Sequence, residues 1–435
     1  MDFQENFLHA VWKYQYFDRK NLQTTLGQHL EIKKIGFHNF HEGPDFLEAH
    51  IFIGNMQYHG NIEIHRKSSD WISHRHSDDS NYNAVILHVV FEHDRPILQS
   101  DGTEIPTLEL KGRIFLDVIR NYERLSESKD DILCGSRLKE TQDIIRYSML
   151  EKTLIERLEI KSDQVLSIME NTKNDWEETA YRWLFQCFGF KTNAKAMFRL
   201  ANAVPYKILK KQGDKPQVLE AILFGQAGLL LDIGEDEYAD HLLSEYSFYQ
   251  KKYGLRPALF LHDWKFMGVR PGNFPHRRLA QLAKILATNN SLFSVVLDCS
   301  KEIAHFRKMF QVNLDPYWEQ HQKPGVISKK KLAPTLSKNT FDLLIINFIS
   351  PLWYSYGKFM NEAHWKEKGF DLLQDISPEN NFVSRKFEKI GWQVQNAFDS
   401  QGMLGLYHIY CKEKRCMDCK IGQNLLKPPK VGLLF

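Results

Sequence analysis

Two adjoining segments of strand-like sequence constrain the fold of this chain more than any other feature. Residues 46–53 read FLEAHIFI and residues 56–67 read MQYHGNIEIHRK, and the two segments meet at Gly54-Asn55. A Gly-Asn pair between two such runs is typical of a tight β-hairpin turn. The sequence therefore predicts two antiparallel strands, and successive side chains of each strand should point to opposite faces of the sheet.

Further segments extend this hairpin into a mixed α/β domain. The spacing of apolar residues predicts a first helix over residues 3–17, strands at 29–37, 84–94 and 104–112, and a polar connection at 69–83. From residue 138 the period becomes helical. We thus expect an α/β domain over residues 1–130, a mainly α-helical domain over 138–405 and a basic, cysteine-rich tail over 406–435.

The composition narrows the class of protein. With 43% hydrophobic and 26% charged residues the chain is globular, and a net charge of +3 is too small to indicate nucleic-acid binding by itself. No run approaches the roughly 20 apolar residues of a membrane span, so we expect a cytoplasmic protein without a membrane partner. Histidine is concentrated near the N-terminus, which directs the search for chemistry to the first domain.

Acidic and basic residues of the hairpin form the first candidate site. Glu63, His65 and Lys67 share one face of their strand, and Asp45 begins the preceding strand. Two neighbouring carboxylates repel unless a cation lies between them, and Mg²⁺ or Mn²⁺ prefers such oxygen ligands. His65 or Lys67 could then orient or activate water. The alternative is a turn capped by Asp45 and a cross-strand surface pair.

The polar connection after the hairpin offers a second set of ligands. SHRHSDDSNYNAVILH contains His74, His76, two aspartates and, further on, His88. These residue types bind zinc or manganese, so a zinc hydrolase acting on a small substrate is conceivable. If the acids hold the metal instead, His74 and His76 are expected to contact a substrate phosphate. The other interpretation is a polar connection of turns with His88 inside a buried strand.

A cysteine trio near the C-terminus gives a stronger metal signal. Cys411, Cys416 and Cys419 follow the spacing C-x4-C-x2-C. Cys134 is the expected fourth ligand, with His408 as the alternative. Zinc and a four-iron cluster both remain open, and reduced cysteines without a metal are the third possibility.

A loop in the helical region combines cations with an aromatic ring. RPGNFPHRR, residues 270–278, brings Arg270, Arg277 and Arg278 next to Phe274. Guanidinium groups and a ring on a rigid loop suit phosphate binding and base stacking. The alternative is a structural loop that packs Phe274 into the helical core.

Pro44-Asp45 and Glu63-Ile64-His65, with the order of helix and strands, resemble the PD-(D/E)-x-K nuclease superfamily. The resemblance covers residues 1–125 and implies that Asp45 and Glu63 bind a metal, with the Ile64 carbonyl as a further ligand and Glu5 or His9 completing the site. His65 stands where that superfamily has lysine, and Lys67 lies one strand repeat further on. One early cysteine plus a late trio resembles the four-iron cluster site of a class of nucleases, although the order and spacing differ.

End to end, the chain resembles an uncharacterised bacterial domain-of-unknown-function family. The motifs that carry this resemblance are ENFLHAVWKY, GPDFLEAHI, GNIEIHRKSSDW, ILHVVFEHD, EAILFGQAGLL, RPGNFPHRRLAQLA and the cysteine trio. The family implies a shared architecture and no activity. The leading expectation is a metal-dependent, nuclease-like enzyme acting on nucleic acid. The alternatives are a non-catalytic nucleic-acid-binding or scaffold protein on a degenerate nuclease fold, and the zinc hydrolase.

Overall fold

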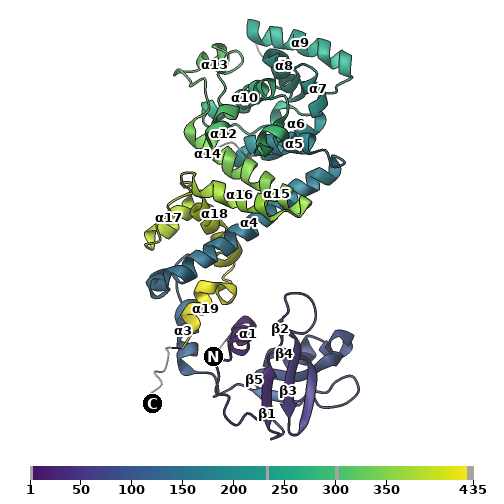
Figure 1. The fold of residues 1–435 in the computed structure, drawn as a ribbon, viewed down its shortest axis with the longest axis vertical. Coiled ribbons are helices and arrows are strands. Elements are labelled where there is room, and N and C mark those ends of the chain that lie inside the picture. The colour runs from purple at the N-terminus through teal and green to yellow at the C-terminus, as the bar shows by residue number, and fades with distance from the viewer. Residues whose placement is uncertain (1–2, 232–234, 299–302, 429–435) are drawn as a thin grey trace. The chain divides into compact units, whose positions relative to one another are not determined.

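The computed structural model describes residues 3–231, 235–298 and 303–428, which form two compact units (Figure 1). Unit 1 comprises residues 1–152, 389–391 and 405–435, and unit 2 comprises 153–388 and 392–404. The division falls inside a long helix and lies later than the domain boundary expected near residue 138. The cysteine-rich tail belongs to unit 1, although its last residues, 429–435, lie outside the described part of the chain.

Unit 1 is a mixed sheet with helices. Its elements are α1 (Glu5–Tyr14), β1 (Leu30–Lys34), β2 (Phe37–His38), β3 (Phe46–Ile53), β4 (Met56–Lys67), α2 (Asp70–Ser73), β5 (Val85–Glu92), β6 (Thr107–Glu109), α3 (Leu116–Ser126), the start of α4 (Asp143–Asn171) and α19 (Lys420–Leu426). The strand order is β1-β3-β4-β5-β6, with β2 also paired to β3. The α/β architecture predicted for the N-terminal region is confirmed.

The predicted hairpin is formed by β3 and β4, which pair antiparallel and turn at Gly54. On its other edge β4 pairs parallel with β5, and Glu63 lies opposite His88 in this register. The segment expected as one strand at 29–37 is divided into β1 and β2, because the backbone takes a positive φ of 91° at Gly36. Helix α1 packs on β4 and supplies buried Phe7, Leu8 and Trp12 to the core of this unit.

Unit 2 is mainly helical, as the period of its apolar residues predicts. It contains α5 (Trp176–Phe188), α6 (Phe190–Ala203), α7 (Tyr206–Lys210), α8 (Pro216–Gln226), α9 (Glu237–Tyr253), α10 (Pro275–Thr288), α11 (Leu292–Leu297), α12 (Ile303–Phe310), α13 (Tyr317–Gln320), α14 (Lys338–Leu344), α15 (Ser350–Met360), α16 (Ala363–Gln374), α17 (Phe382–Lys389) and α18 (Ala397–Gly405), with a small hairpin of β7 (His321–Lys323) and β8 (Val326–Ile327). Helices α8 and α10 pack closely against one another, as do α5 and α6. None of the described helices is both long and apolar enough to cross a membrane.

Candidate metal and nucleic-acid site

Asp45, directly before β3, and Glu63 of β4 lie together in unit 1. The backbone N–H of Asp45 donates to Oε2 of Glu63 over 3.1 Å, and Oδ2 of Asp45 accepts from the N–H of Ile64 over 2.9 Å. Glu63 is buried, whereas the Asp45 side chain keeps 20% of its surface exposed. The pairing of β3 with β4 therefore fixes both acids at one place, and the site opens to solvent on the Asp45 side.

Helix α1 adds two groups to these acids. Nε2 of His9 lies 3.3 Å from Oδ2 of Asp45. Burial alone would lower the pKa of His9, but the hydrogen bond and charge of Asp45, with the charges of Glu5 and Glu63, raise that pKa above its usual value. Burial raises the pKa of Glu5, which also feels the charges of His9, His74 and Asp45. Glu5 and His9, the first-helix residues that the nuclease resemblance implies, thus face the same region.

Three histidines gather beside Glu63. One ring nitrogen from each of His65, His74 and His76 lies within 4.8 Å of the others, which is a spacing that suits a metal ion. Oε1 of Glu63 is 3.2 Å from Nε2 of His76 and 3.6 Å from Nε2 of His65. The histidines of the polar connection and the acids of the hairpin therefore form one continuous cluster.

The parallel strand β5 fixes the orientation of His65. Nδ1 of His65 hydrogen-bonds Nε2 of His88 over 2.8 Å, which leaves Nε2 of His65 to face Nδ1 of His74 at 3.1 Å. Metal-binding histidines usually have their second ring nitrogen held in this way. The sequence placed His88 in a buried strand but gave no sign of this contact, because it depends on the register between β4 and β5.

The electrostatics of the cluster favour an added positive charge. Burial, and then the neighbouring charge of Asp45, raise the pKa of Glu63 to about 9. Burial and the surrounding imidazoles lower the pKa of His65 to about 2, so His65 is neutral at physiological pH. Neutral imidazoles are the form that binds a metal cation, and a divalent ion beside Glu63 would take the place of the proton that the raised pKa retains. The donor set therefore fits a divalent ion.

The structure does not gather all the residues that the sequence assigned to this site. Lys67 is exposed at the end of β4, roughly 13 Å along the strand from Glu63 at the usual rise per residue. It lies opposite Glu92 of β5. Tyr82 was not expected in the site, yet its ring stacks on His76 at 3.8 Å between centroids. Tyr82 comes next to His76 only because of the path that residues 69–83 take in the folded structure.

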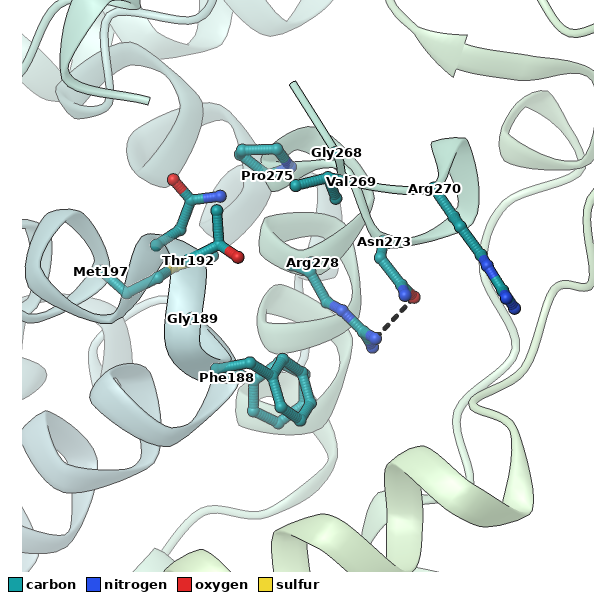
Figure 2. A pocket seen from close by; sticks show the side chains of 12 residues that line it. Phe188, Gly189, Thr192, Met197, Gly268, Val269, Arg270, Asn273, Pro275 and Arg278 are labelled. Atoms are coloured by element: carbon teal, nitrogen blue, oxygen red, sulfur yellow. Dashed lines mark hydrogen bonds between the residues drawn. The ribbon is translucent and has the colours of Figure 1, made fainter. Parts of the chain in front are cut away.

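The arginine loop of unit 2 lines a separate cavity of about 300 Å³ (Figure 2). Its walls come from the start of α6 and from residues 268–278, and they include Arg270 and Arg278. The Arg278 guanidinium packs over the Phe190 ring at 4.9 Å and donates to Asn273 over 2.7 Å. In Figure 2 the exposed Arg270 side chain extends away from this pair.

Arg277 does not line that cavity. It is 1% exposed, and its guanidinium donates to the backbone carbonyl groups of Trp318 and Ala333. The helical period separates it from its neighbour Arg278, since adjacent residues of a helix point in different directions. Arg277 therefore ties α10 to the segments around α13, and its remaining Nε–H is buried away from solvent.

The fold and the cluster define a class: a mixed-sheet unit with a carboxylate–imidazole site, followed by a helical unit. The chain belongs to the family described as "Protein of unknown function (DUF2851)", whose model matches residues 5–382. The match covers the candidate site and most of the helical unit, and it ends before the cysteine trio. No curated protein and no solved structure matches the chain.

Proposed function

We propose that this protein is a metal-dependent, nuclease-like enzyme that hydrolyses phosphodiester bonds in nucleic acid. The observation that carries the proposal is the meeting of Asp45, directly before β3, with Glu63 of β4, with 3.1 Å between the Asp45 nitrogen and a Glu63 oxygen. His9 of α1 approaches the Asp45 carboxylate. Acids held by backbone contacts on neighbouring strands are preorganised ligands for a divalent ion.

The ligand types favour Mn²⁺ over Mg²⁺. Mg²⁺ prefers oxygen ligands alone, whereas Mn²⁺ accepts imidazole nitrogen together with carboxylate oxygen. Asp45 and Glu63 would hold the ion, with His9 close enough to join them. A divalent ion at this place would polarise a phosphoryl oxygen and lower the pKa of a bound water.

The histidines of the cluster differ in the roles that we propose for them. The pKa of His65 is lowered to about 2, so His65 is too weak a base to accept a proton in the reaction. Its role is structural, because its hydrogen bond to His88 fixes the orientation of its ring within the cluster. In this proposal His74 and His76 contact a substrate phosphate. Lys67, at the end of β4, contacts the nucleic-acid strand further from the metal.

The helical unit supplies a second surface for nucleic acid in this proposal. Arg270 is exposed beside a cavity that also holds Arg278 and the Phe190 ring. Phosphate contacts of this kind position a strand without reading its sequence. A cytoplasmic location, where nucleic acid and divalent ions are both present, belongs to the same proposal.

The direct test is cleavage of single- and double-stranded DNA and RNA by the full chain. Each substrate is incubated with Mn²⁺, Mg²⁺, Zn²⁺ or a chelator. We expect cleavage that requires a divalent ion and is fastest with Mn²⁺. Salt-sensitive binding without cleavage in any metal would instead favour the non-catalytic nucleic-acid-binding alternative.

A zinc-dependent hydrolase of a small substrate is the second candidate, and the close grouping of His65, His74 and His76 favours it. Removal of two of these ligands distinguishes the candidates. In His74→Ala/His76→Ala a zinc site would lose its metal together with all hydrolysis. If Asp45 and Glu63 hold the ion, the double variant keeps Mn²⁺ affinity and shows weaker substrate binding.

A further inference from the structure

Four cysteines from two distant parts of the chain line one small cavity in unit 1. Cys134 precedes a short 3-10 helix, whereas Cys411, Cys416 and Cys419 come from the C-terminal segment. Leu133, Tyr410 and Gly422 complete the walls. His408, the other candidate ligand, is exposed and is not part of this lining. The convergence joins residues that are almost 280 positions apart in the sequence.

The four thiols are reduced, although they face one another. None of the described cysteines forms a disulfide. Burial raises the pKa of Cys134 to about 12 and that of Cys416 to about 12, and the neighbouring thiols raise both further. Burial raises the pKa of Cys411 as well, with contributions from the other three cysteines. Four cysteines that line one cavity are nevertheless the donor set of a thiolate-bound metal centre, and this grouping carries the argument.

Backbone donors support the thiolate form at one of the four positions. Burial raises the pKa of Cys419, and the backbone N–H groups of Gly422 and Ile421 at the start of α19 offset part of that rise. Hydrogen bonds from the backbone to sulfur stabilise the charged form and are a regular feature of metal-bound cysteine. A core cysteine that serves only as a small apolar residue needs no such donors.

The spacing of the sulfur atoms distinguishes a single zinc ion from an iron–sulfur cluster. Among the described residues the only set of three ligand atoms within 4.8 Å of one another is the histidine set, so the cysteine sulfurs are more widely spaced. Four thiolates around one zinc ion at about 2.3 Å would lie roughly 3.8 Å apart. An iron–sulfur cluster stands between its thiolates and holds them further apart. The sulfur atoms are thus too far apart for all four to bind one zinc ion as they stand.

We propose that Cys134, Cys411, Cys416 and Cys419 bind a four-iron, four-sulfide cluster that fastens the C-terminal segment to unit 1. The 3-10 turn Cys416–Asp418 contacts α1, the helix that carries Glu5 and His9, and α19 contacts α3. The cluster therefore has a structural role, since it closes a loop of almost 280 residues and supports the helix at the candidate site.

Metal analysis of the full chain tests the proposal independently of any activity. The protein is purified without oxygen, and iron, sulfide and zinc are measured together with the visible absorption and the electron paramagnetic resonance of the reduced sample. We expect about four iron and four sulfide per chain and a broad visible band. About one zinc per chain without sulfide would overturn the proposal. So would a chain that takes up neither metal after incubation with iron and sulfide.

Variants and proteolysis test the fastening role. Cys134→Ser should lose most of the iron and sulfide, whereas Cys187→Ser, at a half-buried thiol of unit 2 that donates to a carbonyl oxygen over 3.2 Å, should keep both. Trypsin can cut after the exposed Lys412, Lys414 and Arg415 between two of the ligands. Removal of iron by a chelator should speed this cleavage several-fold in the wild-type chain. Equal cleavage rates before and after iron removal would contradict the fastening role.

Discussion

The backbone N–H of Asp45 donates a hydrogen bond to the Glu63 carboxylate over 3.1 Å. In return the Asp45 carboxylate accepts from the N–H that follows Glu63, at Ile64. Each acid is therefore held by the other strand of the hairpin. Their separation is set by strand pairing, so they form a preorganised pair rather than two mobile side chains.

Loss of the Glu63 charge should remove metal-dependent cleavage. Glu63→Gln keeps the shape of the side chain but weakens a ligand oxygen, and we expect cleavage of nucleic acid in Mn²⁺ to fall by at least about 100-fold. The rate is measured with end-labelled DNA and RNA. The matched control is Glu48→Gln on the same sheet, where the side chain is 74% exposed and cleavage should be unchanged. Full activity in Glu63→Gln would refute the assignment of the site.

Nucleic-acid affinity should depend on Arg270 in a salt-dependent way. If Arg270 contacts one phosphate, Arg270→Ala should weaken binding and lower the slope of log K against log salt by about 0.7–0.9. Fluorescence anisotropy at several salt concentrations measures this slope. Arg256→Ala, at an exposed arginine elsewhere in unit 2, serves as the control. An unchanged slope in Arg270→Ala would exclude a phosphate contact there.

The stability of unit 2 should fall as the pH rises toward 8. Burial raises the pKa of Glu220 from 4.5 to about 8, although Tyr238 and Trp318 each donate to its Oε1 over 3.0 Å. Because the folded-state pKa is the higher one, the protonated carboxyl favours the folded state. That contribution is complete below pH 4.5 and is lost progressively as the pH rises through about 8.

Thermal unfolding at a series of pH values checks this expectation. Glu220→Gln keeps a carbonyl acceptor for Tyr238 and Trp318 but cannot ionise, so its melting temperature should vary less between pH 5 and pH 9. Glu367→Gln, at an exposed glutamate of α16, should follow the wild-type curve. Parallel curves for wild type and Glu220→Gln would show that Glu220 does not control this dependence.

A methyl group at Gly225 should destabilise unit 2. Gly225 lies within α8, and a Cβ atom there would overlap the ring of Tyr246 on α9. Gly225→Ala therefore forces the two helices apart, and we expect a loss of about 1–3 kcal/mol in the free energy of unfolding. Gly272→Ala is the control, because a Cβ there meets no atom within 4 Å. Equal denaturation midpoints for the two variants would argue against close packing of α8 on α9.

Most secondary structure could be predicted from the sequence because its signals are local. The Gly54-Asn55 turn and the residue patterns beside it predicted β3 and β4, which form with nearly the expected bounds. The apolar period of residues 143–169 indicates one long helix, and the structure has α4 there, over Asp143–Asn171. Alternation and helical period depend on neighbouring residues only, so they are visible without the fold.

The sequence also supplied the residue types of the candidate site, and strand parity placed Glu63 and His65 on one face. It could not decide whether Lys67 lies near enough to join the site, how His88 holds His65, or which histidines gather. These contacts depend on the parallel pairing of β4 with β5 and on the path of residues 68–84, both of which join parts of the chain through space.

The sequence by itself determined the two structural classes, the hairpin and the ligand chemistry, since each depends on residue type and local spacing. Only the tertiary structure decided that Asp45 meets Glu63, that Cys134 joins the cysteine trio and that Arg277 is buried. The physical reason is that burial and distance are set by packing between segments far apart in the chain, and a single sequence carries no direct record of that packing.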